Sequence, residues 1–199
     1  VLSASQFNAG LRPGDLIWHE NDGNENFTPA YIGWGADITN IDTADVDGDG
    51  DVDILASHSV KNLVVMYAND GNENFTEHTF SEAAIGALDV HAADLDGDGD
   101  IDVLSASSGL LPTGEPHATT LYAAIAWYEN NSTESFTPRT IATSLDINTA
   151  RSVDTADLDG DGDIDVLSAS SGDDTIAWYE NGVLLDIGAT ERNYQQRRA

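Results

Sequence analysis

The sequence predicts an all-β protein built from a repeated unit of four short antiparallel strands. A nine-residue acidic motif occurs three times, at residues 45–53, 94–102 and 157–165. Each copy is followed by a run in which apolar and polar residues alternate and Val, Ile and Leu are frequent, which is typical of a strand. The copies begin 49 and then 63 residues apart, and helical periodicity is weak throughout. We therefore interpret the chain as an array of strand repeats.

The clearest unit covers residues 40–86, and its elements can be assigned in order. The expected strands are 38–44, 52–59, 63–70 and 71–80. The acidic motif separates the first two strands, and an NDGN sequence at 69–72 is typical of the hairpin turn between the last two. The units at 87–143 and 149–188 repeat this order, with expected strands at 87–93, 101–108, 124–129, 135–141, 150–156, 164–171 and 175–181.

Two segments depart from this repeat. Residues 109–123 are an insertion rich in Pro and Gly, which we expect to form an extended surface loop. Residues 1–39 form a partial unit, because VLSAS, DLIWHEN and ENFTPAYI match the second, third and fourth strands of the later units. The first blade is therefore expected to lack its acidic loop and its first strand.

A single four-stranded unit cannot bury both of its faces, so neighbouring units must stack. The expected architecture is a β-propeller-like array of about four four-stranded antiparallel blades, forming one domain over residues 1–188 with incomplete terminal blades. Aromatic and apolar side chains on the third strands are expected to pack between blades, with an aromatic ligand platform as the alternative. These residues are Trp18, Trp127, Trp178, Tyr128, Tyr179 and Ile176.

The chain offers three ways to complete its open ends. Residues 183–187 (VLLDI) are apolar enough to form a strand that finishes the last blade, or one that completes the first blade by ring closure. Otherwise two chains could join through their open blades as a homodimer, because an unpaired strand edge invites pairing. Residues 189–199 hold three of the seven basic residues, and we expect a disordered basic tail there.

The acidic motif has the sequence D-x-D-G-D-G-D-x-D, which predicts a calcium loop. Five carboxylates in nine residues repel one another in a compact fold unless a cation lies among them, and the glycines permit a sharp turn. Alternating Asp side chains and backbone carbonyls supply the six to eight oxygen ligands that Ca²⁺ takes. An EF-hand closes with Glu at position 12, but Ala56, Ser105 and Ser168 stand there, so the ninth Asp is the better closing ligand.

About three Ca²⁺ sites are therefore expected, with an acidic, solvated turn as the alternative. We expect side-chain ligation from the first, third, fifth and ninth positions and a backbone carbonyl from the seventh. The candidate metal residues are Asp45, Asp47, Asp49, Asp51, Asp53, Asp94, Asp96, Asp98, Asp100, Asp102, Asp157, Asp159, Asp161, Asp163 and Asp165. His91 lies three residues before a loop, where the other units have Asp42 and Asp154, and we interpret it as a loop-flanking polar residue.

Composition narrows the function classes. The net charge of -29 disfavours nucleic acid and anionic membranes as partners. Cysteine is absent, which excludes disulfides and thiol chemistry, and no apolar run is long enough to cross a bilayer. No signal peptide opens the chain. Catalytic motifs such as H-E-x-x-H and G-x-S-x-G are also missing, so no catalytic residue is expected.

The segment DLDGDGDIDVLSASS, followed by IAWYEN and NFT-type strands, resembles the FG-GAP/VCBS repeat of integrin-α-like β-propellers. The resemblance covers nearly residues 1–181 and implies calcium between the first and second strands of each blade. It also implies an extracellular, cell-surface or periplasmic setting, a role in adhesion or in binding a protein or carbohydrate ligand, and no catalytic residues. Two alternatives remain: a lectin-like module using the insertion and Tyr122, and a glycan- or phosphoester-acting enzyme whose site spans blade loops.

Overall fold

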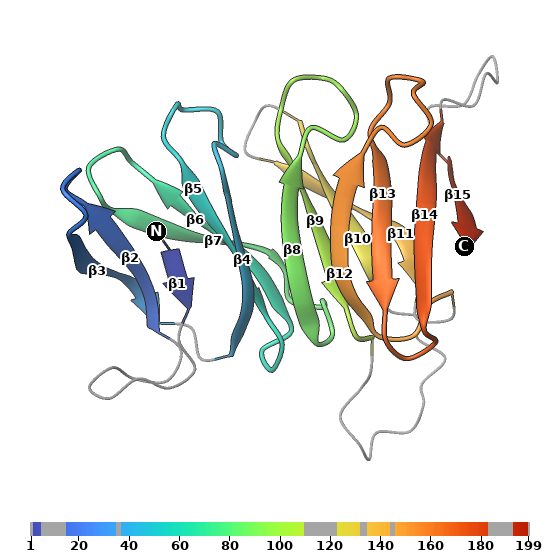
Figure 1. The fold of residues 1–199 in the computed structure, drawn as a ribbon, viewed down its shortest axis with the longest axis horizontal. Helices are drawn as coiled ribbons and strands as arrows, with labels where there is room; N and C mark the ends of the chain where they lie inside the picture. Colours follow the sequence, from blue (N-terminus) through green and yellow to red (C-terminus); the bar gives the residue numbers. More distant parts are fainter. Residues whose placement is uncertain are drawn as a thin grey trace.

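The computed structural model describes residues 2–4, 15–34, 37–109, 123–131, 135–143, 146–182 and 193–198. These residues form four antiparallel sheets, here called the first to fourth blades in chain order (Figure 1). The first blade contains β1 (Leu2–Ala4), β2 (Asp15–Asn21) and β3 (Phe27–Trp34). The second contains β4 (Ile38–Ala44), β5 (Asp53–His58), β6 (Leu63–Asn69) and β7 (Phe75–Ser81).

The later blades repeat this plan. The third contains β8 (Ala87–Ala93), β9 (Asp102–Ser107), β10 (Ala123–Asn130) and β11 (Phe136–Thr143). The fourth contains β12 (Ala150–Ala156), β13 (Asp165–Ser170), β14 (Thr175–Gly182) and β15 (Asn193–Arg198). Strands lie in each sheet in chain order, so hairpins alone connect them and every acidic motif joins a first strand to a second. The predicted all-β fold of propeller-like blades is confirmed.

The two terminal blades differ from each other. The first has three described strands, as expected, and β1 pairs with β2 as a second blade strand would. The fourth differs from the expectation, because residues 193–198 of the predicted disordered tail form β15 and pair with β14. The free edge of β14 would otherwise present unpaired backbone groups, which any extended segment can satisfy whatever its side chains. Residues 183–187, 189–192 and 110–122, which include the possible closing strand and most of the insertion, lie outside the described residues.

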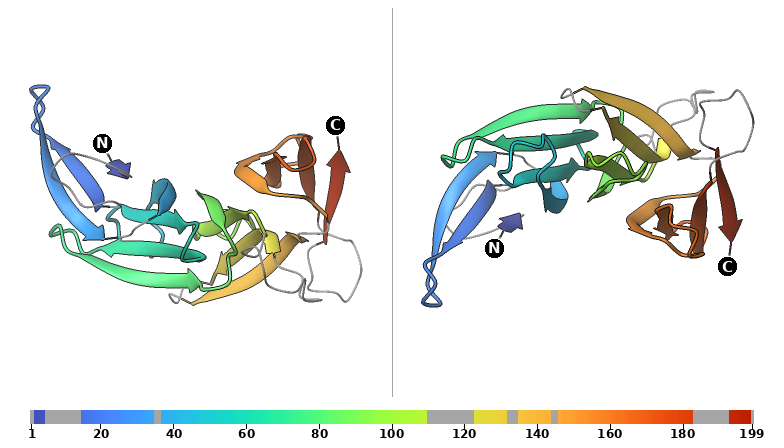
Figure 2. Two further views of the ribbon diagram at one scale, coloured as in Figure 1. Left: turned by 90° about the horizontal axis from the view of Figure 1, so that it is seen from below. Right: turned by 90° about the horizontal axis from the view of Figure 1, so that it is seen from above.

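The blades stack face to face in an open arc, with the first and fourth at its two ends (Figure 2). Strands β4, β8 and β12 lie in contact along the inner side of this arc. Apolar side chains fill the space between each pair of blades as three clusters, one at each junction. Strands β5 and β9 are buried along their whole length, because a blade covers each of their faces. The described residues contain no helix that could cross a membrane.

Candidate metal sites and the blade junctions

The three acidic loops have the same backbone course, and all three lie on the upper side of the arc in Figure 1. Their fourth and sixth residues are glycines with positive φ, +77° at Gly48 and +99° at Gly50 in the first loop. Residues with a Cβ rarely adopt these angles, which explains why the glycines recur. The chain therefore turns sharply enough to bring the two ends of the motif together.

Backbone amides of each loop point at its own carboxylates. In the second loop, Asp94 accepts hydrogen bonds from the amides of Gly97 at 2.8 Å and Gly99 at 3.1 Å. The fifth residue, Asp98, instead accepts the amide of the seventh, Asp100, at 2.9 Å. The other two loops repeat the bond between fifth and seventh residues. The first Asp is thus held facing the centre of the loop.

The carboxylates of the first, third and ninth positions converge in every loop. One oxygen from each lies within 4.8 Å of the others, a spacing that could hold a metal ion. The groups are Asp45, Asp47 and Asp53; Asp94, Asp96 and Asp102; and Asp157, Asp159 and Asp165. Within the described residues, the fifth and seventh Asp side chains do not belong to these groups, so the structure brings together three of the four predicted side-chain positions.

The ninth carboxylate is completely buried in each loop and begins the second strand. Asp102 accepts the amide of Leu95 at 3.0 Å with Oδ2 and the amide of Asn130 at 2.7 Å with Oδ1. Burial raises the pKa of Asp102 to about 6, although these two amides act to lower it. An ionised carboxylate is therefore costly here without further positive charge, which a bound cation would supply.

Two observations in the first loop test whether a cation fits. Asp45 Oδ1 is buried and has no hydrogen-bond partner among the described residues, so one carboxylate of this group has a buried oxygen without a donor. Burial raises the pKa of Asp47, and the neighbouring carboxylates of Asp53, Asp49 and Asp45 raise it further. A site with only oxygen donors suits hard cations such as Ca²⁺ and Mg²⁺. The residues present therefore fit a divalent metal ion.

Three asparagines tie the loops to the blades, and sequence reasoning did not identify them. Asn69, Asn130 and Asn181 each donate their backbone amide to the ninth Asp of their own blade. The side-chain amides of the last two also reach the preceding blade, where Asn130 donates to the carbonyl of Val46 at 2.9 Å and Asn181 to that of Leu95 at 2.8 Å. The sequence does contain a pattern that could have identified these asparagines, because each one follows the tyrosine of its strand by two residues.

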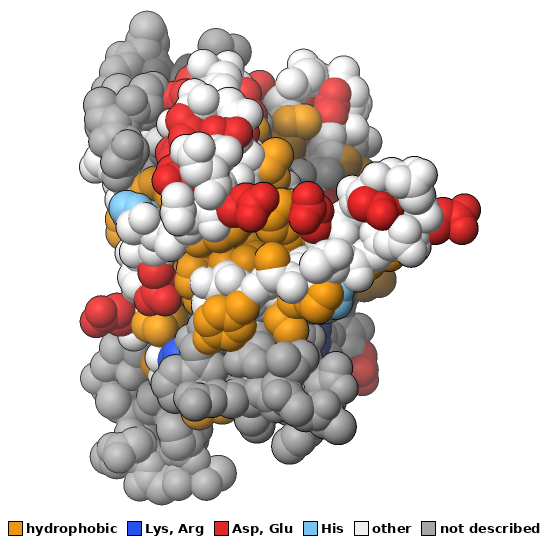
Figure 3. Space-filling model, turned by 90° about the vertical axis from the view of Figure 1, so that its left-hand side faces the viewer, with side chains coloured by type: hydrophobic (Ala, Val, Ile, Leu, Met, Phe, Trp, Pro, Cys, Tyr) orange, Lys and Arg blue, Asp and Glu red, His pale blue; other side chains and the backbone are white. Residues whose placement is uncertain are grey.

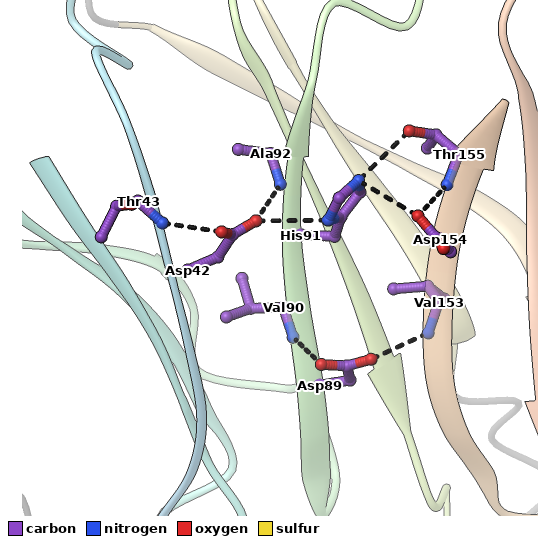
Figure 4. A network of polar contacts seen from close by, with 9 residues as sticks. All are labelled: Asp42, Thr43, Asp89, Val90, His91, Ala92, Val153, Asp154 and Thr155. Carbon is purple, nitrogen blue, oxygen red and sulfur yellow. Dashed lines mark hydrogen bonds and ion pairs between the residues drawn. The ribbon is translucent and has the colours of Figure 1, made fainter. Parts of the chain in front are cut away.

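A polar network joins the inner strands of three blades (Figure 4). His91 on β8 lies between β4 and β12. Its Nδ1 is 3.2 Å from Asp42 Oδ2 on β4. Its Nε2 is 3.1 Å from Thr155 Oγ1 and 3.7 Å from Asp154 Oδ1, both on β12. Asp89, also on β8, accepts the amide of Val153 on β12 at 2.9 Å. The residue interpreted as loop-flanking thus lies at the meeting point of the second, third and fourth blades.

These contacts affect protonation at the centre of the network. The hydrogen bond with Asp42 raises the pKa of His91 above its usual value, against the opposing effect of burial, and the charges of Asp42, Asp154 and Asp89 add to this increase. Burial acts to raise the pKa of Asp42, but hydrogen bonds from His91 and from the amides of Thr43 and Ala92 outweigh it and lower that pKa. Both shifts favour a charged pair between the blades.

Comparison with known proteins relates the chain to a family of repeats. The family model of the FG-GAP-like repeat matches residues 1–56, 56–105 and 117–168. A comparison with curated proteins found no match to this sequence. Each matched segment contains one acidic loop and ends within the strand that follows it. With four propeller-like blades and an acidic loop in each repeat, the chain belongs to the FG-GAP-like repeat family.

Proposed function

We propose that this protein is a calcium-dependent binding module that acts outside the cell or at its surface and has no catalytic activity of its own. One observation carries the proposal, the convergence of three carboxylates in each of three loops on the same side of the arc. Calcium is favoured because the donors are carboxylate and backbone oxygens in a flexible loop. Extracellular calcium modules work at the millimolar calcium levels found there.

Calcium would stabilise the blades as well as the loops. The ninth Asp is a candidate ligand and also accepts the amide of the Asn that contacts the preceding blade, so an ordered loop supports the junction. Calcium that binds only the folded state stabilises it by about 2.7 kcal/mol per site at a concentration 100 times Kd. The intended ligand is a protein or a carbohydrate, and the acidic surface argues against nucleic acid.

A carbohydrate ligand is the second candidate, and a groove favours it. Between the second and third blades a groove of about 340 Å³ is lined by His78, Phe80 and Phe136 together with Asp47 of the first acidic loop. A volume of this size suits a small ligand, and aromatic faces beside polar groups are common in such sites. Tyr122 and most of the insertion, which the sequence analysis associated with this function, lie outside the described residues. A glycan array in calcium would distinguish carbohydrate from protein ligands.

The deciding experiment is thermal unfolding in millimolar CaCl₂, in MgCl₂ and in EDTA, with isothermal titration calorimetry for stoichiometry. We expect a large rise in melting temperature with calcium and about three sites per chain. The variant Asp96→Asn should lose one site, whereas Glu82→Gln, an exposed carboxylate outside the loops, should keep all three. Equal melting temperatures in CaCl₂ and EDTA would show that the loops are acidic turns that bind no calcium, and would refute the proposal.

A further inference from the structure

Two asparagines each join a pair of neighbouring acidic loops. The side-chain amide of asparagine has two hydrogen atoms to donate. Asn130 donates to the carbonyl of Ile101, the eighth residue of its own loop, at 3.1 Å, and to that of Val46, the second residue of the first loop, at 2.9 Å. Asn181 repeats both contacts, at 3.0 Å in its own loop and at 2.8 Å to Leu95 of the second loop. Both hydrogen atoms of each side chain are therefore used, one on each loop.

The residues that meet these asparagines also hold the ninth carboxylate of each loop. Asp102 Oδ2 accepts the amide of Leu95 at 3.0 Å, and Asp102 Oδ1 accepts the backbone amide of Asn130 at 2.7 Å. In the third loop, the two corresponding amides reach the ninth Asp at 3.0 and 2.8 Å. In the first loop, the amide of Val46 reaches Asp53 at 2.9 Å. The hydrogen-bonded chain that joins the three loops therefore runs through Asp53, Val46, Asn130, Asp102, Leu95, Asn181 and Asp165.

This hydrogen-bonded chain is shielded from water along its length. The three ninth carboxylates are 0% exposed, and Asn130 and Asn181 are 5% and 1% exposed. The side chains of Val46 and Leu95 are buried in the apolar clusters of two blade junctions. Water cannot replace a partner that is lost at such buried groups, so breaking one of these bonds is costly. A loop that shifts therefore moves the adjoining asparagine with it.

We propose that Asn130 and Asn181 are positioning residues that couple the loops, so that calcium bound at one loop raises the calcium affinity of the next. The coupling rests on the calcium binding proposed above. An ordered loop fixes the carbonyl of its second residue, and this carbonyl holds the asparagine whose backbone amide positions the ninth carboxylate of the following loop. The following loop then loses less conformational freedom when it binds an ion, which gives positive coupling. Coupling between binding sites is reciprocal, so each loop favours the other.

Electric charge alone predicts the opposite sign. Seen from the first blade, acidic side chains lie mainly in the upper half of the molecule, on the side of the loops (Figure 3). Each cation bound there lowers the negative charge that attracts the next one, so the affinity would fall from one ion to the next, and salt would screen this effect. Positive coupling in high salt therefore distinguishes the hydrogen-bonded chain from the effect of charge.

Asn69 of the second blade provides a matched control. Its backbone amide donates to Asp53 at 2.9 Å, and its side-chain amide donates to the carbonyl of Val52 in its own loop at 3.2 Å. In the described part of the chain, its side chain makes no hydrogen bond to another acidic loop. Asn69→Ala therefore removes contacts within one blade, whereas Asn181→Ala also removes the contact between two loops.

The first test is hydrogen–deuterium exchange in EDTA, measured by mass spectrometry on peptides that cover each loop. Asn181→Ala should speed exchange in residues 94–102 about fivefold, because the carbonyl of Leu95 loses a donor that lies 86 residues further along the chain. Asn69→Ala should leave exchange in this peptide unchanged. Equal exchange of residues 94–102 in the parent and in Asn181→Ala would show that Asn181 does not order the preceding loop, and would overturn the proposal.

The second test is a double-mutant cycle on calcium affinity in high salt. Asp159→Asn removes a candidate ligand of the third loop, and asparagine can still accept the amide of Asp161 there. The calcium dependence of exchange in residues 94–102 gives the apparent dissociation constant of the second loop. We expect Asp159→Asn to raise this constant about fivefold or more in the parent and to change it little in the Asn181→Ala background. A purely structural role for Asn181 would give Asp159→Asn the same effect in both backgrounds and would refute the coupling.

Two further outcomes separate this proposal from the calcium proposal. If the second loop bound calcium equally well in the parent and in Asp159→Asn, the loops would be independent, and the coupling would be refuted while the calcium proposal stood. If calcium slowed exchange in none of the three loops, the calcium proposal itself would be refuted, and the coupling of calcium sites with it.

Discussion

Asp102→Asn distinguishes the structural role of the ninth loop residue from its proposed role as a metal ligand. The carboxylate of Asp102 is fully buried and accepts the amides of Leu95 and Asn130. Asparagine has one carbonyl oxygen, so it can satisfy one of these donors, while its NH₂ group faces the other. Losing a charge-assisted hydrogen bond and leaving a buried donor unsatisfied costs about 2–4 kcal/mol.

An opposing effect reduces this cost. Burial raises the pKa of Asp102 to about 6, which means that burying the ionised carboxylate costs free energy, and a neutral amide removes that cost. We expect a net loss of about 2 kcal/mol in EDTA, which corresponds to roughly 4–8 °C in melting temperature for a chain of this length. In calcium the difference should widen, because the variant also loses a charged candidate ligand.

The assay is urea and thermal unfolding of the parent, Asp102→Asn and Asp98→Asn, each in EDTA and in CaCl₂. Asp98 is exposed and accepts the amide of Asp100, a bond that asparagine can preserve, so this control should lie within about 0.5 kcal/mol of the parent in EDTA. If Asp102→Asn unfolded at the parent's midpoint in EDTA, its hydrogen bonds to the third blade would not be structural and our reasoning would be wrong.

Two further predictions concern the junctions. The His91→Gln variant should gain less stability than the parent when the pH is lowered from 8 to 6. The raised pKa of His91 contributes stability that is fully present below its unfolded pKa of about 6.5 and is lost as the pH rises through its folded pKa. Equal dependence of the two free energies of unfolding on pH, measured with urea, would contradict this. Asn130→Ala removes the donor to the buried carbonyl of Val46 and to that of Ile101 and should cost about 2 kcal/mol in EDTA. Asn72→Ala, in an exposed turn, should be close to neutral, and equal melting temperatures for these two variants would show that the inter-blade bond adds no stability.

Much of this structure could be predicted from neighbouring residues. Side chains along a strand alternate with a period of two, and Asn-Gly or Asp-Gly pairs are typical of hairpin turns. The sequence of residues 63–80 is therefore enough to predict the hairpin that these residues form. The acidic loops are equally local, since nine consecutive residues supply both the carboxylates and the glycines that turn them inward. The fifth Asp was also expected to be a ligand, which stays a prediction; in the structure its carboxylate accepts the amide of the seventh residue.

The three described strands of the first blade could also be predicted, because residues 1–39 align with the second, third and fourth strands of the later units. The end of the fourth blade could not be predicted. Residues 193–198 have no strand-like alternation, yet β15 forms, since a ladder of backbone hydrogen bonds needs no particular side chains. Sequence pattern predicts strands from alternating apolar residues, so it misses an edge strand whose own sequence has no such alternation.

The sequence by itself determined the repeat, the strands and the acidic loops, because each depends on residues close together in the chain. Only the tertiary structure decided how the blades meet. Asn181 contacts a carbonyl 86 residues away, and His91 lies between carboxylates of two other blades. Such contacts depend on how far each blade rotates against the next, which no local pattern encodes. The same rotation sets how the four described blades curve into an arc (Figure 2).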